Sequence, residues 1–240
     1  MRLYLSSFRI GDHPEKLVEL SGKGGVAIIS NALDFIPDDV RRKYEAEVYN
    51  PRKEFSDLGL ASSDLDLRHY WENRSRLRDD IRKFGLVWIQ GGNAFLLMRA
   101  LHRSGFPDVI RELLARDEIA YGGFSAGAVV ATPTLQGIEL MDDPTQLADG
   151  YEPEVRWQGM GLVDFSIVPH YRSNHPEAES AEAAVSFMER NGLPFKALSD
   201  GEVFIVNNDV GALLPGKAAS GRRPAAAGRD AHGRARFHKT

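Results

Sequence analysis

Residues 119–127, IAYGGFSAG, decide how this chain is interpreted. The apolar start of this stretch is typical of a buried strand, and residues 126–131 are suited to begin a helix. Ser125 lies between them in a G-x-S-x-G pattern, flanked by Gly123 and Gly127. A sharp strand-to-helix turn exposes such a hydroxyl, and the small neighbours let backbone and substrate approach closely. The pattern predicts a nucleophilic serine, although it also arises by chance in glycine-rich turns, and the chain has 23 glycines.

A second glycine pair follows another predicted strand. Residues 86–89 are apolar, and Gln90-Gly91-Gly92-Asn93 comes directly after them. In an open parallel sheet, ligands bind beyond the carboxyl ends of the strands, so this loop is expected beside Ser125. The backbone N–H groups of Gly92 and Ala126 are therefore candidates for an oxyanion hole. The alternative for Gly92 is a tight turn that needs a positive φ.

Strand-like apolar runs recur along the chain, with helical stretches between several of them. The runs lie at residues 3–8, 26–30, 86–90, 119–124, 165–169, 195–198 and 203–206. Such alternation predicts an α/β fold with a doubly wound, mostly parallel sheet and helices on both faces.

Composition narrows the functional class. The 240 residues are 42% hydrophobic and 27% charged, which is typical of a globular protein of one domain. The chain has no cysteine, so a disulfide scaffold, a cysteine zinc site and a cysteine nucleophile are excluded. The apolar run at the start of the chain is too short for a secretory signal, and no apolar stretch approaches the length of a membrane span. We therefore expect a cytoplasmic protein that does not bind membranes.

Charge separates a tail from the rest of the chain. The net charge is −4, and residues 216–240 hold seven Lys or Arg against one Asp, so the tail carries +6 and the remainder −10 (−4 minus +6). The tail is rich in Ala, Gly and Arg without apolar periodicity, which predicts disorder. We therefore expect one domain over 1–214, no closing strand beyond 209–211, and a basic tail over 215–240. A basic tail can bind nucleic acid, but a solvated appendage is the simpler interpretation, and no nucleic-acid partner is assigned.

His170 is the candidate general base. It ends the apolar run at residues 165–169 and so emerges at the carboxyl edge of a strand, where it could take the Ser125 proton. His175 is its nearby rival. Together with Glu177, the two histidines could instead hold a metal ion, but their spacing fits no standard helical ligand pair.

Asp200 is the candidate partner of that base. A catalytic imidazole needs an acceptor that fixes its tautomer and stabilises the imidazolium. Asp200 follows the run at residues 195–199 and precedes Gly201, again at a strand end. Three carboxylates in the loop after the elbow helix compete for the role, namely Glu139, Asp142 and Asp143.

These motifs together resemble those of the peptidase E family, the aspartyl dipeptidases and their cyanophycinase relatives. The matching segments are residues 5–7, 9–11, 90–93, 123–128, 133–134, 168–170 and 197–201. The resemblance implies a serine peptidase on a fold similar to class I glutamine amidotransferases, with Ser125 as nucleophile, His170 as base and an acidic partner at Asp200. It requires no metal or organic cofactor.

The same resemblance suggests the substrate. It implies hydrolysis of small peptides through an acyl-enzyme, with a preference for an N-terminal aspartate in some members. Asn93 and Arg172 are the candidates for binding the substrate. The alternatives are another serine hydrolase of the cyanophycinase type or an amidotransferase-like binding domain without catalysis. Oligomeric state and the role of the tail are not specified by the sequence.

Overall fold

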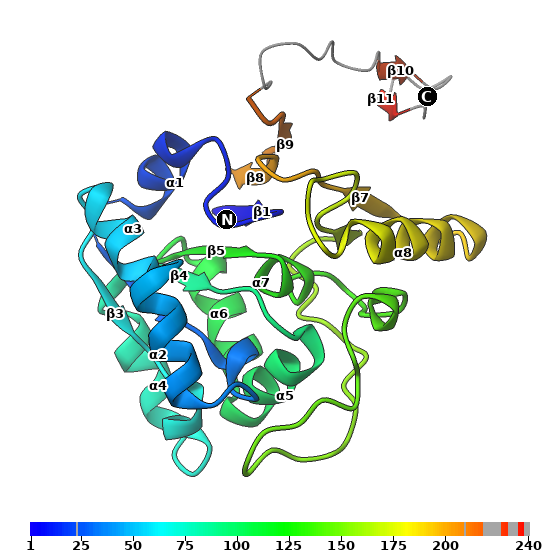
Figure 1. The fold of residues 1–240 in the computed structure, drawn as a ribbon. Helices are drawn as coiled ribbons and strands as arrows, with labels where there is room; N and C mark the ends of the chain where they lie inside the picture. The colour runs from blue at the N-terminus through cyan, green and yellow to red at the C-terminus, as the bar shows by residue number, and fades with distance from the viewer. Residues whose placement is uncertain (23, 209, 218–226, 230–234, 238–240) are drawn as a thin grey trace.

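The fold is built around a seven-stranded mixed sheet (Figure 1). The structure is a computed structural model that describes residues 1–22, 24–208, 210–217, 227–229 and 235–237. The strands run in the order β3-β2-β4-β5-β1-β8-β9, and the first five are parallel. Their bounds are β1 Leu3–Ser6, β2 Gly25–Ile29, β3 Ser62–Asp64, β4 Phe84–Ile89, β5 Ala120–Phe124, β8 Val203–Asn207 and β9 Val210–Leu214. The predicted α/β class is confirmed.

Helices cover both faces of this sheet. They are α1 Pro14–Ser21, α2 Asp38–Glu47, α3 Pro51–Asp57, α4 Ser75–Ile81, α5 Ala94–Ser104, α6 Phe106–Ala115, α7 Ala126–Val129 and α8 Ala178–Arg190, with 3-10 turns η1 Asn31–Leu33, η2 Leu67–Tyr70 and η3 Ile138–Leu140. Proline in the first turn of α1, α3 and α6 suits a helix start, because the N–H that it lacks has no intrahelical partner there.

Two apolar clusters lie on opposite faces of the sheet. Alternate residues of β1, β2 and β4 enter different clusters, as Leu3 and Tyr4 show, because successive strand side chains point to opposite faces. One cluster contains Leu17 of α1 and Phe55 of α3, and the larger one contains residues of α4 to α8 (Figure 1). The central strands are thus buried on both sides, as expected of a doubly wound sheet.

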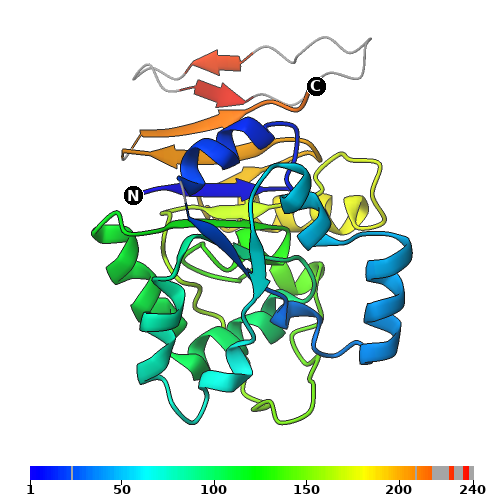
Figure 2. The same cartoon turned by 90° about the vertical axis from the view of Figure 1, so that its left-hand side faces the viewer.

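The end of the sheet corrects one expectation. β8 pairs antiparallel with β1, and β9 pairs antiparallel with β8, so a closing strand does follow residue 209 (Figure 2). The strand was missed because its five residues, VGALL, are exposed or only partly buried and give no strong alternation. Most of the tail at 215–240 lies outside the described residues, but two of its segments, β10 Ala227–Arg229 and β11 Ala235–Phe237, pair as antiparallel strands.

Two of the predicted strands lie outside the main sheet. β6 (Ser166–Val168) and β7 (Phe195–Ala197) form a parallel pair of their own, in the register Ser166 opposite Phe195. The residues that follow them therefore emerge side by side at the same end of the pair. In the described part of the chain, no helix is both long enough and apolar enough to span a membrane.

Candidate active site

Ser125 occupies a strained turn between β5 and α7. Its φ is 48° and its ψ is −118°, a left-handed conformation that residues with a Cβ rarely adopt. The turn is held by the Ser125 N–H, which lies 3.2 Å from the carbonyl oxygens of both Ser6 and Ser7. Such strain persists only where the surrounding structure enforces it, and it is frequent at functional sites. The local geometry is that of a nucleophile elbow.

The glycine after the elbow is required by close packing. A Cβ on Gly127 would lie 2.2 Å from the carbonyl oxygen of Ile89, inside any allowed contact. The Gly127 carbonyl also accepts a hydrogen bond of 2.6 Å from Tyr121. Helix α7 is therefore pressed against β4 and β5, which places its N-terminus beside the loop that follows β4.

Two backbone amides lie where the oxyanion hole was predicted. Gly92 has a φ of 136°, and a Cβ there would lie 2.5 Å from the Ala32 carbonyl oxygen, so only glycine fits. Ala126 is the first residue of α7. Among the described residues we find no hydrogen bond from the N–H of either Gly92 or Ala126. Gly92 lines the cavity described below, and the role of the two N–H groups as an oxyanion hole stays a prediction.

His170 and Asp200 form a hydrogen-bonded pair at the ends of β6 and β7. His170 Nδ1 lies 2.8 Å from Asp200 Oδ1, and the imidazole is 2% exposed. Burial acts to raise the pKa of Asp200, but hydrogen bonds from His170 and Ser7 outweigh it and hold the pKa below its ordinary value. We assign the proton to Nδ1 because Asp200 is an ionised acceptor. Nε2 then carries a lone pair that can accept a proton.

Ser7 joins this pair to β1, a contact that the sequence analysis missed. The Ser7 hydroxyl accepts a hydrogen bond of 2.8 Å from the backbone N–H of His170 and donates one of 2.8 Å to Asp200 Oδ1. Ser7 is fully buried. The only signal in the sequence was its position near the end of a predicted strand, in a segment that matches the family pattern. The loop after β1 thus positions both members of the pair.

A cavity of about 270 Å³ lies over these groups. Ser125, Gly92 and His170 line it, and its walls are mostly apolar, formed by Phe8, Leu33, Ile36, Val40, Tyr49 and Phe124. Within the described part of the chain, no hydrogen bond joins the Ser125 hydroxyl to His170. Nε2 of His170 instead lies 3.7 Å from a carboxylate oxygen of Glu177, which also lines the cavity.

His175 stacks on the candidate base. The ring centroids of His170 and His175 are 3.7 Å apart and their planes differ by 7°. Burial and the neighbouring His170 lower the pKa of His175. With Glu177, the two histidines offer ligand atoms that lie within 4.8 Å of one another. A ring nitrogen binds a metal in the plane of its ring, so two stacked rings cannot both reach one ion unless one turns; we therefore assign no metal here.

The competing carboxylates make other contacts. Asp142 accepts a hydrogen bond of 2.8 Å from the Ala94 N–H, and burial raises its pKa to about 7. Asp143 bonds the N–H and hydroxyl of Thr145, and Glu139 bonds the N–H of Gly137. Of the four candidates, Asp200 is the carboxylate that the fold brings to His170.

The two predicted substrate-binding side chains lie elsewhere. The Asn93 side chain caps α5 by accepting from the Leu96 N–H at 2.8 Å, and its amide donates to the Asp143 carbonyl. Arg172 is outside the residues that line the cavity; its Nε lies 3.3 Å from Glu182, and its guanidinium lies over the Tyr171 ring. Asn93 thus caps a helix and Arg172 contacts Tyr171 and Glu182, and their proposed contact with substrate stays a prediction.

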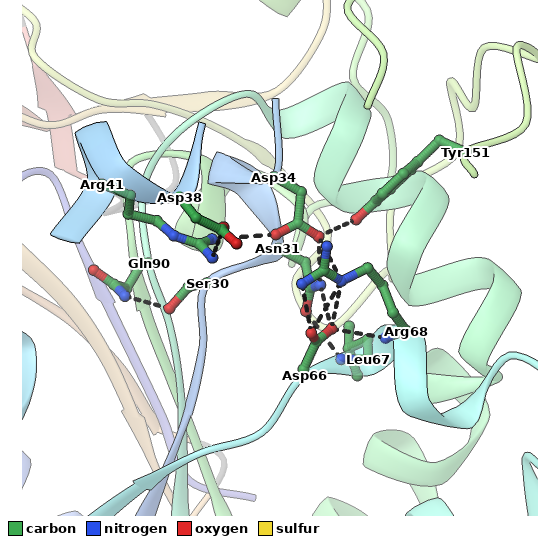
Figure 3. A network of polar contacts seen from close by, with 10 residues as sticks. All are labelled: Ser30, Asn31, Asp34, Asp38, Arg41, Asp66, Leu67, Arg68, Gln90 and Tyr151. Carbon is green, nitrogen blue, oxygen red and sulfur yellow. Dashed lines mark hydrogen bonds and ion pairs between the residues drawn. The ribbon is translucent and has the colours of Figure 1, made fainter. Parts of the chain in front are cut away.

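A polar network holds the loop that supplies part of the apolar wall (Figure 3). At its centre is Asp34, whose side chain is 2% exposed and lies 3.3 Å from Arg41 and 3.4 Å from Arg68. Asn31 and Tyr151 donate to the same carboxylate at 2.8 and 2.6 Å. These contacts anchor residues 31–41, which include Leu33, Ile36 and Val40 of the cavity wall.

Comparison of the sequence with known proteins gives a consistent result. Residues 24–214 match the model of peptidase family S51. An uncharacterized peptidase of Pasteurella multocida is 28% identical over 186 residues, which cover 76% of this chain and 84% of that protein. Peptidase E of Streptomyces coelicolor is 28% identical over 215 residues, 82% of each chain. An alpha-aspartyl dipeptidase candidate of Drosophila melanogaster is 32% identical, over 56% of this chain and 55% of its own length.

Solved structures agree with the fold. The crystal structure of a peptidase E candidate from Listeria monocytogenes superimposes with a TM-score of 0.72 at 25% identity, covering 89% of this chain and 98% of its own. A peptidase from an acI-B1 actinobacterium gives a TM-score of 0.60 at 13% identity, which bears on the fold alone.

Proposed function

Because the chain belongs to peptidase family S51, and is therefore a peptidase, we propose that it cleaves short peptides through an acyl-enzyme formed on Ser125. The observation that carries this proposal is the shared cavity: Ser125 on its strained turn and His170, oriented by Asp200, line the same space. The volume of about 270 Å³ is at the small end for ligand pockets, which favours a di- or tripeptide.

Each group has a role in the proposed reaction. The Ser125 oxygen attacks the peptide carbonyl carbon while its proton passes to Nε2 of His170. The N–H groups of Gly92 and Ala126 stabilise the oxyanion; losing one such donor costs about 3 kcal/mol of barrier in another serine protease. The C–N bond then breaks as Nε2 returns the proton to the leaving amine, and water releases the acyl group by the same path.

The contact between Ser125 and His170 is expected to form with substrate. Catalytic hydrogen bonds are often long or poorly aligned in enzymes without substrate and tighten in the complex. The bond from the His170 N–H to Ser7 holds the His170 backbone, whose φ is 61°, and the bond between Nδ1 and Asp200 orients the ring. We therefore expect the Ser125 side chain, rather than the His170 ring, to move when substrate binds.

The decisive experiment is hydrolysis of Asp-Leu, Leu-Leu and p-nitrophenyl acetate by the wild type and by four variants. Ser125→Ala and His170→Ala should each abolish peptide hydrolysis, and the double variant should be no worse than either, because the two residues act as a unit. Ser56→Ala, an exposed serine of α3, is the matched control and should keep full activity.

The outcomes separate the alternatives. Wild-type rates retained by Ser125→Ala would refute the acyl-enzyme, and additive losses would show that Ser125 and His170 act independently. Ester cleavage without peptide cleavage would favour another serine hydrolase. A preference for Asp-Leu is part of the proposal only by analogy with the Drosophila relative's name, and the same panel tests it.

A further inference from the structure

Two arginines line the cavity over Ser125, and they differ in what they bind. Arg41 belongs to the polar network and makes ion pairs of 3.3 Å to Asp34 and 3.1 Å to Asp38. For Arg9, no hydrogen bond or ion pair to another residue is found in the part of the chain that the structure describes. Among those described residues its five N–H donors have no hydrogen-bond partner, so they can bind a ligand.

Aromatic rings hold Arg9 in place. Its guanidinium carbon lies 4.4 Å from the centroid of the Tyr49 ring and 5.0 Å from that of Phe8. Phe8 in turn packs edge-on against His170, at 5.9 Å between ring centroids. The Tyr49 hydroxyl donates a hydrogen bond of 2.7 Å to Glu54. Burial raises the pKa of Glu54, and the positive charge of Arg9 acts against that rise, but no hydrogen bond or ion pair between Arg9 and Glu54 is found among the described residues. The rings fix the cation by cation–π contact while leaving its donor edge unpaired.

The backbone of Arg9 is in a strained conformation. Its φ is 47°, in the left-handed region that residues with a Cβ seldom occupy. The same loop carries Ser7, which binds His170 and Asp200, so the position of Arg9 is tied to the position of the candidate base. Strain of this kind is concentrated at ligand clamps and active sites.

Most of the remaining wall is apolar, which favours a strong ion pair at Arg9, and the acidic residue that lines the cavity, Glu177, lies beside His170. The apolar lining includes Leu33, Ile36 and Phe124. It also includes Val40 and Tyr44 of α2, which are 51% and 49% exposed and would be covered by a bound ligand. Apolar walls lower the local dielectric, which strengthens attraction between charges. A guanidinium with free donors in such a place suits a carboxylate, which it can bind through two parallel hydrogen bonds.

We infer that Arg9 binds a carboxylate of the peptide substrate in the cavity beside Ser125, a role that the sequence analysis gave to Arg172. The inference rests on the proposed function. Two carboxylates of a short peptide have the required chemistry: its C-terminus, and the side chain of an aspartate next to the cleaved bond. The apolar walls then contact the other side chain of the peptide.

The test compares matched peptides with and without each carboxylate. Leu-Leu against Leu-Leu amide probes the C-terminus, and Asp-Leu against Asn-Leu probes the side chain. Arg9→Met keeps the bulk and removes the charge, Arg9→Lys keeps the charge, and Arg76→Met, an exposed arginine of α4 outside the cavity, is the control. Thermal unfolding checks that each variant folds.

We expect Arg9→Met to raise KM for the recognised carboxylate about ten- to a hundredfold, the effect of losing a charge-assisted hydrogen bond. The value of kcat should change far less, because the contact is made in both ground and transition states. Arg9→Lys should recover part of the loss, and the control should equal wild type. Selective loss on Leu-Leu identifies the C-terminus as the ligand, and lost preference for Asp-Leu over Asn-Leu identifies the side chain.

The inference is overturned if Arg9→Met hydrolyses the peptides with wild-type KM ratios for both matched pairs. If the wild type cleaves none of the four, the proposed function fails, and binding decides the role of Arg9 separately. Calorimetric titration of the four peptides into Ser125→Ala, with and without Arg9→Met, measures that binding. Equal affinity of the two proteins for every carboxylate peptide, or no binding to either, would also refute the inference.

Discussion

Replacement of Ser7 by alanine tests how the candidate acid–base pair is positioned. The change removes one hydroxyl that accepts from the buried His170 N–H and donates to Asp200, each at 2.8 Å. A buried N–H left without a partner costs about 1–3 kcal/mol, and a hydrogen bond to a charged group contributes about 1.5–3 kcal/mol. Since one hydroxyl makes both contacts, we expect a combined loss of about 2–4 kcal/mol in the free energy of unfolding.

For a chain of this size, such a loss lowers Tm by about 4–16 °C. Circular dichroism melting at pH 7 measures it, with Ser6→Ala as the matched control, because Ser6 is equally buried and its hydroxyl makes only a 3.4 Å contact with the Phe8 carbonyl. Peptide hydrolysis should fall, because the His170 backbone is no longer fixed. Equal melting of the two variants would refute the assigned role of Ser7.

The pH dependence provides a second check on the same variant. The pKa of Asp200 is lower in the folded chain than in the unfolded chain, so its contribution to stability is present above the unfolded pKa, about 3.9. That contribution is lost as the pH falls through the folded pKa. Ser7→Ala removes one of the bonds that lower this pKa. The difference in Tm from wild type should therefore narrow below about pH 4, and a constant difference would contradict the explanation.

Three further changes test other parts of the structure. Burial raises the pKa of Asp142 to about 7, so the protonated carboxyl contributes stability that is complete below the unfolded pKa and is lost as the pH rises through 7. Asp142→Asn should therefore flatten the dependence of Tm on pH between about 4 and 7. An unchanged slope would contradict the burial of that carboxyl. Gly127→Ala places a Cβ 2.2 Å from the Ile89 carbonyl oxygen and should lower the free energy of unfolding in urea by about 1–3 kcal/mol. Most of the activity should also be lost, because the elbow is displaced. Full activity would mean that the turn tolerates the shift. Asp34→Asn removes the buried anion between two arginines and should cost about 3–5 kcal/mol in urea unfolding. A loss under about 1 kcal/mol would show that these ion pairs contribute little to stability.

Several features of the candidate site could be predicted because they depend on local pattern. The glycines around Ser125 and the pair before Asn93 mark places where a Cβ would crowd nearby atoms, such as the Ile89 carbonyl at Gly127 and the Ala32 carbonyl at Gly92. Such requirements are visible in the residue types. The positions of His170 and Asp200 followed from a general rule, since both come directly after strand-like runs. Their catalytic roles stay predictions until the variants are assayed.

Other features depended on contacts between distant segments. The apolar runs at 165–169 and 195–198 predicted strands, but their pairing with each other outside the main sheet brings His170 to Asp200. Nothing in the pattern around Ser7 shows that its hydroxyl meets residues far along the chain. Arg172 is near His170 in sequence, yet its left-handed backbone, with φ of 53°, accompanies a side chain that lies over Tyr171 and beside Glu182.

The sequence by itself determined the α/β class, the elbow serine, the exclusion of cysteine chemistry and the set of candidate groups, because strand periodicity and glycine requirements are properties of short segments. Tertiary structure alone decided which carboxylate meets His170, that Ser7 supports the pair, and that Arg9 rather than Arg172 faces the cavity. Those outcomes depend on how strands pair and how helices pack over the sheet, and side-chain direction is set only when these long-range contacts form.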